Sequence, residues 1–251
     1  MIYSFFSLDA YDKFSIRSKE LLIDKKEYLK TFSLGNLPFY YNKKYRYLYT
    51  EYNDNIEVFL KTLINYIKYN DYYLNKQVMA YLYGLIINYN LDNTLNPYLN
   101  YIGGNSMYTG IKNYLDNYLV KLKEKKNPYF FKGYKYSFNI DSFDKDLIEV
   151  INFTYKEVYD IDSFSKIYLD SIKKMKRFYK VFRYDPLGIK KLFYFRNRNL
   201  SYHTKNNSEY LNLDHNKWFI DKKSNSLSFI ELYLKALYNT NNMINDINQY
   251  I

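Results

Sequence analysis

Residues 79–101 read MAYLYGLIINYNLDNTLNPYLNY, and this stretch decides the fold. Its apolar residues recur every three to four positions, which predicts one buried face of a helix; they are Tyr81, Leu82, Leu85, Ile86 and Tyr89. A row of small polar residues follows the same helix: Asn88, Asp92, Asn93 and Asn96. Asn88 and Asp92 are four residues apart and therefore share a helix face. Pro97 disfavours helix at the residue before it, so we expect the helix to end at Asn96.

The pattern YLYGLIINYNLDNTLNPY, residues 81–98, resembles the core of the zinc-dependent phospholipase C family, in the intracellular type of low-GC Gram-positive bacteria. In that family the three polar positions are a histidine, an aspartate and a second histidine, and all three bind zinc. The resemblance implies that Asn88 and Asn96 replace two zinc ligands, while Asp92 keeps the third.

The resemblance continues upstream of this helix. Residues 31–42, TFSLGNLPFYYN, are similar to the family's G-P-D segment and its following apolar and aromatic residues. Leu37 stands where the family has a zinc-bridging aspartate. A further ligand histidine of the family aligns best with Glu51 or Tyr52. Two more ligand positions are therefore expected to be lost in this part of the chain.

Downstream segments extend the similarity over most of the chain. Residues 108–119, YTGIKNYLDNYL, resemble the family's H-x-x-x-E helix, with Tyr108 in place of the histidine, Lys112 in place of the glutamate, and Asp116 kept. Residues 210–219 and 228–237 resemble the closing segment of the bacterial subfamily. The resemblance implies one all-α domain over residues 1–251, with the helical fold of phospholipase C and P1 nuclease, and a degenerate former metal site.

The residue counts independently disfavour a zinc cluster. Zinc binds four or five donors and prefers nitrogen and sulfur ligands. The chain has no cysteine, and its two histidines, His203 and His215, lie far from the polar helix face in the sequence. Lys112 would repel a nearby cation. We therefore expect no metal, no cofactor and no catalytic residue, which favours a protein that is not an enzyme.

Asp92 leaves three interpretations open. It can be a buried polar group satisfied by Asn88 and neighbouring donors, which is how buried polar groups usually persist. It can also form a hard-cation site with Asn96 and other oxygen ligands. The third interpretation is a modified ligand pocket.

Composition predicts the class of protein. The 251 residues contain no segment rich in glycine, serine or proline that would divide two domains, and 47% of them are hydrophobic, enough for one large core. The 35 tyrosines and the abundance of lysine, asparagine and isoleucine are typical of an AT-rich genome. The lack of cysteine, of a basic leader and of a long apolar run predicts a cytoplasmic protein without a transmembrane segment.

Hydrophobic periodicity predicts an all-α chain. We expect helices over residues 14–32, 56–69, 108–125, 143–159, 164–182 and 186–195, and a last helix that begins at Ser226 or Ser228 and runs towards Tyr250. Asp54, Ser142 and Ser163 are the expected N-caps. Loops are expected over 35–47 and 103–106, and a long surface loop over 196–221. Only the stretches near Tyr45 and Tyr134 are weak strand candidates.

The net charge is +11 and the calculated isoelectric point is near 9.3, which favours an anionic partner: a protein, a nucleic acid or an anionic lipid surface. Basic residues mix with tyrosines in several segments. The candidate anion-binding surface consists of Lys43, Lys44, Arg46, Lys121, Lys123, Lys125 and Lys126. The competing interpretation is that these lysines only solvate helix faces in an AT-biased sequence. The sequence does not fix the oligomeric state.

Three functions are compatible with these observations. The first is a catalytically inactive homologue of zinc-dependent phospholipase C that acts as a binding or scaffold protein through a basic, aromatic-rich surface. The second is a hydrolase of altered metal chemistry acting on phosphoesters, with one metal held by Asp92, Asp116 and amides. The third is a nucleic-acid-binding protein, in which exposed rings stack on bases.

Overall fold

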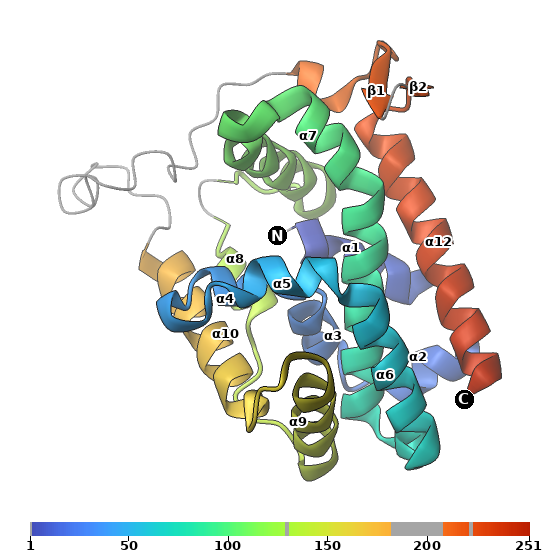
Figure 1. Cartoon of the computed structure of the whole chain (residues 1–251). Coiled ribbons are helices and arrows are strands. Elements are labelled where there is room, and N and C mark those ends of the chain that lie inside the picture. The colour runs from blue at the N-terminus through green and yellow to red at the C-terminus, as the bar shows by residue number, and fades with distance from the viewer. Residues whose placement is uncertain (1, 129–130, 182–207, 221–222) are drawn as a thin grey trace.

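The computed structural model describes residues 2–128, 131–181, 208–220 and 223–251 (Figure 1). Nearly all regular structure in these ranges is helical, and one two-stranded antiparallel sheet accompanies it. The predicted all-α class is confirmed. Within the described part of the chain, no helix combines the length and the apolar character needed to cross a membrane.

The first third of the chain consists of short helices followed by one longer helix. The α-helices are α1 (Ile2–Lys13), α2 (Ile16–Leu22), α3 (Lys26–Phe32), α4 (Leu37–Tyr40), α5 (Leu48–Asp54) and α6 (Ile56–Tyr69). Two 3-10 helices lie between them and after them, η1 (Lys43–Tyr45) and η2 (Tyr72–Leu74). The predicted helix 56–69 is confirmed, but the predicted helix 14–32 is two helices, α2 and α3.

The remaining elements surround a long central helix, α7 (Lys76–Glu124). They are α8 (Gly133–Ser137), α9 (Lys145–Tyr159), α10 (Phe164–Val181), η4 (Ser208–Leu211), β1 (Trp218–Ile220), β2 (Lys223–Asn225) and α12 (Phe229–Tyr250). Helices α1, α3, α6 and α12 all contact α7. Figure 1 shows α12 running alongside the first arm of α7.

Helix α7 folds back on itself. The Tyr3 hydroxyl is 2.7 Å from Asp92 Oδ1 and 3.3 Å from Lys112 Nζ, so Asp92 and Lys112 are close in space. A straight helix would separate these two residues by about 30 Å, because each residue adds about 1.5 Å. Figure 1 shows the turn at the top of α7, with the second arm returning behind the first.

The prediction that the helix ends at Asn96 was therefore wrong. The helix continues through Pro97, and the expected loop at 103–106 and the separate helix at 108–125 belong to the same continuous helix. Proline removes one backbone hydrogen bond and its ring displaces the preceding turn, which bends a helix without necessarily ending it. In this chain, Pro97 lies inside α7, between Asp92 of the first arm and Lys112 of the second.

Helix α1 is enclosed on nearly all sides. Its buried residues include Ile2, Tyr3, Ser4, Phe5, Phe6, Ser7, Ala10 and Tyr11. Its serines are satisfied internally: Ser4 Oγ donates to Ser137 Oγ at 2.7 Å, and Ser7 Oγ donates to the Ser4 carbonyl at 2.9 Å. Because apolar and small residues occur all around this helix, it has no amphipathic stripe, and periodicity did not predict it.

The core is dominated by aromatic rings. Phe32 on α3 packs edge-on against Tyr81 on α7, with 5.0 Å between the ring centroids. The close approach of these helices depends on Gly84, because a Cβ atom there would lie 2.5 Å from Phe32 Cβ. The buried hydrophobic residues form one connected cluster around α7.

Several local predictions need correction. The expected loop 35–47 contains α4 and η1, and the strand candidates near Tyr45 and Tyr134 lie in η1 and α8. The sheet instead pairs β1 with β2, Trp218 opposite Asn225, inside and beyond the expected surface loop. The expected helix 186–195 and residues 196–207 of that loop lie outside the described residues.

The helix starts differ from the prediction by one or two residues. Asp144, and not Ser142, caps α9 by accepting a hydrogen bond from the Leu147 amide. Asp54 closes α5, and Asn55 precedes α6 without a side-chain cap. Of the two predicted starts of the last helix, Ser226 and Ser228, the structure has Ser228: Ser228 and Glu231 form a capping box, in which each side chain accepts from the other's backbone amide.

At the start of α10 the capping group comes from another helix. Ser163, the predicted N-cap, has a positive φ of 54°, and Asn152 Oδ1 on α9 accepts the hydrogen bond from the Ser165 amide at 2.8 Å. The capping group of α10 therefore also joins α10 to α9.

Candidate functional site

The polar row of α7 meets the start of α1. Asp92 is partly buried, and its two carboxylate oxygens accept hydrogen bonds from the Tyr3 hydroxyl at 2.7 Å and from the Asn88 amide at 3.4 Å. Asn88 is only 3% exposed. The expected pairing of Asp92 with Asn88 is present, and Tyr3 is an additional partner that sequence reasoning missed.

Lys112 comes to this cluster from the second arm of α7. Its ammonium group donates to the Tyr3 hydroxyl at 3.3 Å, and that hydroxyl in turn donates to Asp92. Burial raises the pKa of the Asp92 carboxyl above its usual value, and Lys112, Tyr3 and Asn88 oppose this shift in that order. The cation that acts on this carboxylate is therefore the Lys112 ammonium, a group of the protein itself.

The other carboxylate of the second arm also binds α1. Asp116 is buried, and its Oδ1 accepts a hydrogen bond from the Ile2 backbone amide at 2.6 Å. The amide N–H groups in the first turn of a helix have no partner inside the helix, so a carboxylate placed there stabilises the helix start. Asp92 and Asp116 therefore hold the first turn of α1 between the two arms of α7.

The segment before Leu37 lies against the same cluster. Gly35 has a φ of +55°, and a Cβ atom at this position would be 2.2 Å from Asn88 Oδ1. Leu37 itself is partly buried and packs against the hydrophobic core as the first residue of α4. Its apolar side chain offers no ligand where the resemblance implied an aspartate.

The remaining predicted positions are less informative. Glu51 is exposed on α5. At Tyr52 and Tyr108 the structure describes the helical backbone, and the side chains are outside the described part. Asn96 is partly buried on the first arm of α7, one turn beyond Asp92.

The donor set does not fit a zinc cluster. Among the described residues, no three histidine, cysteine, aspartate or glutamate side chains gather where they could hold a metal ion. Both oxygens of Asp92 accept protein hydrogen bonds, and an ammonium group lies beside them. A cation placed there would have to displace these donors and would be repelled by Lys112.

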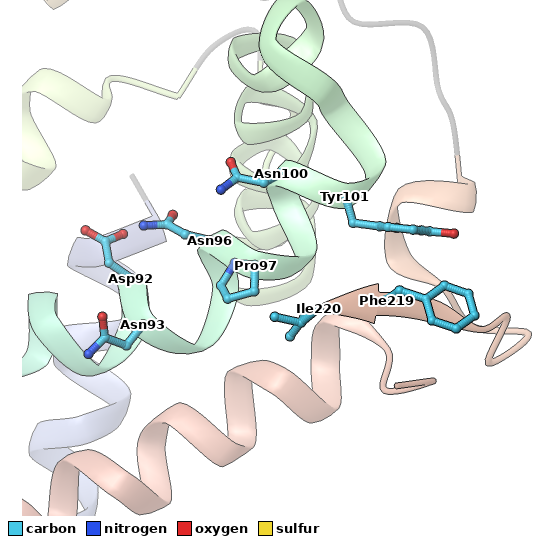
Figure 2. Close-up of a pocket in the computed structure, with 8 residues that line it drawn as sticks. All are labelled: Asp92, Asn93, Asn96, Pro97, Asn100, Tyr101, Phe219 and Ile220. Carbon is cyan, nitrogen blue, oxygen red and sulfur yellow. The ribbon is translucent and has the colours of Figure 1, made fainter. Parts of the chain in front are cut away.

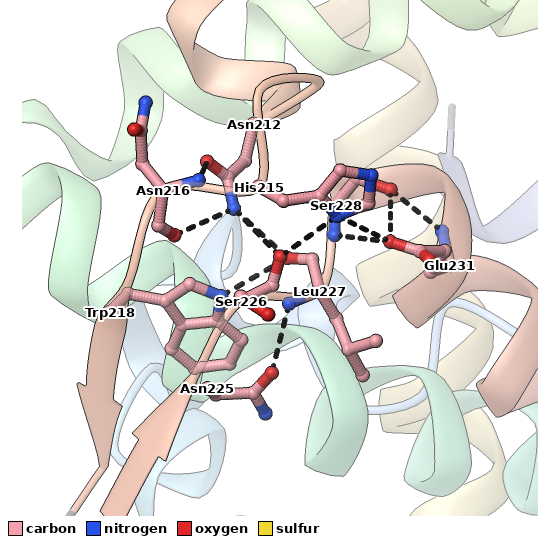
Figure 3. Close-up of polar contacts among 9 residues, drawn as sticks. All are labelled: Asn212, His215, Asn216, Trp218, Asn225, Ser226, Leu227, Ser228 and Glu231. Atoms are coloured by element: carbon pink, nitrogen blue, oxygen red, sulfur yellow. Dashed lines mark hydrogen bonds and ion pairs between the residues drawn. The ribbon is translucent and has the colours of Figure 1, made fainter.

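His215 belongs to the polar network beside the β1–β2 hairpin, which is separate from the Asp92 cluster (Figure 3). Its Nδ1 is 3.2 Å from the Ser226 carbonyl oxygen and 3.3 Å from a Glu231 carboxylate oxygen. Asn212 closes the same loop: its side-chain amide donates to the backbone carbonyls of Asn216, Ser226 and Leu227. His203 lies outside the described residues.

A pocket opens on the outer side of the polar row (Figure 2). Its volume is about 460 Å³, and it is lined by Asp92, Asn93, Asn96, Pro97, Asn100, Tyr101, Phe219 and Ile220. Six of these residues come from one face of α7 and two from β1. Asn100, Tyr101, Phe219 and Ile220 are pocket residues that sequence reasoning missed, because the fold alone brings β1 to α7.

The predicted basic residues occur at two separate places. Lys43, Lys44 and Arg46 are exposed in or next to η1, and the Arg46 guanidinium lies 4.1 Å from the centroid of the Tyr40 ring. The others are exposed at the end of α7: Lys121, Lys123, Lys125 and Lys126.

The two groups differ in their acidic neighbours. Lys123 pairs with Asp9 at 2.5 Å and Lys126 with Glu124 at 2.8 Å. Within the described ranges, no ion pair involves Lys43, Lys44 or Arg46. The positive charge at η1 is thus the less neutralised of the two.

Comparison with known proteins gives no relative. The chain matches no protein-family model, no curated protein and no solved structure.

Proposed function

We propose that this chain is a catalytically inactive member of the zinc-dependent phospholipase C family that works in the cytoplasm as a binding or scaffold protein. The single observation that carries the proposal is a chain of hydrogen bonds among groups of the protein itself. The Lys112 ammonium, the Tyr3 hydroxyl and the Asp92 carboxylate form a continuous chain of hydrogen bonds where the resemblance implies zinc ligands.

Because the cation beside Asp92 is the Lys112 ammonium, we assign this cluster a structural role. The Asp92 carboxylate takes part in holding α1 between the arms of α7, so its hydrogen bonds serve folding instead of activating a water molecule. A phosphoesterase with one metal at Asp92 and Asp116 would have to give up the bonds to Tyr3 and Ile2. This argument favours the inactive protein over the hydrolase of altered metal chemistry.

We assign binding to the basic surface at η1, defined by Lys43, Lys44 and Arg46. Asn42, next to η1, donates to Ser171 Oγ at 2.8 Å and accepts from Lys174 at 3.1 Å, which fixes η1 against α10. Such a surface attracts anionic partners.

The test uses equal charge changes at two places. We expect Lys44→Glu combined with Arg46→Glu to weaken binding to phosphatidylserine-containing vesicles, or to single-stranded RNA, by about tenfold or more at low salt. Lys121→Glu combined with Lys125→Glu is the matched control, because it changes the net charge equally at the other basic site. Vesicle flotation and RNA fluorescence anisotropy measure the two partners separately.

The salt dependence and the location of the effect decide the outcome. A steep loss of binding with rising salt that is seen with RNA and not with vesicles would favour the nucleic-acid-binding alternative. Equal losses in both double variants would contradict a localised surface. Hydrolysis of phosphatidylcholine vesicles by the wild-type protein with added zinc would contradict the inactive site.

A further inference from the structure

The pocket beside Asp92 differs in charge from the rest of the molecule. The chain has 37 lysines and arginines, yet none of the eight residues that line this pocket is basic. Its one charged residue is Asp92, whose carboxylate oxygens already accept hydrogen bonds from Tyr3 and Asn88. Among the described residues that line this pocket, an anionic ligand such as a phosphate would therefore meet no opposite charge.

Amides supply most of the polar groups of the pocket. Asn93, Asn96 and Asn100 follow one face of α7 at spacings of three and four residues. Each side-chain amide can both donate and accept hydrogen bonds. Asn100 is exposed, and among the residues that the structure describes its amide has no hydrogen-bond partner. A row of such groups matches hydroxyls, which are also donors and acceptors.

The other end of the pocket is aromatic and apolar. Tyr101 is 49% exposed and Phe219 is 51% exposed, and Figure 2 shows both rings projecting from the same end, away from Asp92. The exposure of Phe219 follows from β1, in which side chains alternate between faces. Trp218 is only 1% exposed and its Nε1 donates to the Leu227 carbonyl at 3.1 Å, so the next residue must point outward.

The hairpin that carries Phe219 is fixed against α7. The Tyr98 hydroxyl donates to the Tyr210 carbonyl at 3.1 Å, and the rings of Tyr98 and Trp218 are 5.2 Å apart. The pocket is therefore formed by parts of the structure that are held in place before any ligand arrives. Its volume of about 460 Å³ lies in the range of ~300–1,000 Å³ that small-molecule sites occupy.

We propose that this pocket binds an uncharged saccharide, with the asparagine amides of α7 bonding its hydroxyls and the Tyr101 and Phe219 rings packing on the C–H face of a pyranose. An aromatic ring combines a large apolar surface with an electron-rich face, which suits the weakly polarised C–H groups of a sugar ring. This site does not depend on the proposed function, because neither zinc chemistry nor the basic surface contributes to it.

Binding of cellobiose, maltose and N,N′-diacetylchitobiose to the full-length protein tests the proposal. Isothermal titration calorimetry gives the affinity, and the fluorescence of Trp218, the only tryptophan, reports on the strand that carries Phe219. We expect at least one disaccharide to bind, and Asn100→Ala and Phe219→Ala each to weaken it by about tenfold. Asn245→Ala and Tyr238→Ala on α12 are matched controls, because both residues are exposed outside the pocket.

Further experiments distinguish the class of the ligand and its source. Retention of the wild-type protein on insoluble cellulose or chitin, lost in Phe219→Ala, would support a polysaccharide as the source of the saccharide. Failure of all three disaccharides to bind would overturn the proposal. So would tighter binding of phosphocholine or inorganic phosphate at the same site, or equal losses in the pocket and control variants.

Discussion

At the scale of single residues, Asp92 is the group on which the site depends. Its carboxylate links α1 to the first arm of α7 through Tyr3, and Lys112 joins from the second arm. Asn88 holds the other oxygen while its own side chain fills the space over Gly35. Three segments distant in sequence thus meet at one buried carboxylate.

The raised pKa of Asp92 makes a stability prediction with a definite sign. The native state keeps the Asp92 proton to a higher pH than the unfolded chain does, so the native state binds more protons in the window that begins near pH 4. Stability must then fall as pH rises through the raised pKa. We expect Asp92→Asn to remove this contribution. The unfolding free energy of the variant minus that of the wild type should therefore increase as pH rises.

Urea unfolding of both proteins between about pH 4 and pH 7 measures this difference. Asp246→Asn, which removes an exposed carboxylate on α12, is the control for a general effect of charge. A difference between Asp92→Asn and wild type that stays constant with pH, or shrinks as pH rises, would contradict the assigned environment of Asp92.

At the scale of secondary structure elements, the contact between α3 and α7 is the closest helix packing that the site requires. A Cβ atom at Gly84 would lie 2.5 Å from Phe32 Cβ and 2.9 Å from the Phe32 carbonyl carbon. Since the second of these is a backbone atom, the helices would have to separate. The segment that continues from α3 to Gly35 would move away from Asn88 as well.

Gly84→Ala should therefore destabilise the protein by about 1–3 kcal/mol, the usual cost of overpacking a core. In an open helix the same change would stabilise it by about 1 kcal/mol, because alanine is the better helix former. Thermal or urea unfolding distinguishes the two signs. Asn245→Ala on the exposed side of α12 serves as the control for helix propensity, and a stabilised Gly84→Ala would refute the close approach.

The elements also show how far sequence reasoning reaches. Helix α6 was predicted to the residue because it has a strong 3.6-residue pattern. Ser228 was one of two predicted starts of α12, because serine is a favoured N-cap residue. Helix α1 was missed because it is buried on nearly all sides, and the course of α7 because the helix continues through Pro97 and folds back on itself. These two features depend on contacts between distant parts of the chain.

The contacts of the candidate site were likewise predictable only where the two residues are close in the sequence. The pairing of Asn88 with Asp92 follows from their spacing on one helix and was predictable. Tyr3 was not, because nothing in a local window relates residue 3 to residue 92. Phe219 in the pocket depends on the hairpin, whose strands of three residues are too short to give a periodic signal.

At the scale of the whole molecule, an internal cation joins two arms of one helix, while the excess positive charge is distributed outside. Lys112 is directed to Tyr3 and Asp92, whereas Lys44 and Arg46 are exposed at η1. We assign a structural role to the cluster of Tyr3, Asp92 and Lys112, and the proposed binding to the exposed surface. The pocket lined by Asn100 and Phe219 adjoins the Asp92 cluster and has no basic residue among its described lining residues.

The zinc content of the purified, untagged wild-type protein tests the central claim most directly, because an added histidine tag would itself bind metal. Elemental analysis after dialysis against zinc-containing buffer should give well below one equivalent per chain, since Lys112 and the hydrogen bonds to Asp92 leave no suitable donor set. One or more tightly held zinc ions per chain would contradict the account.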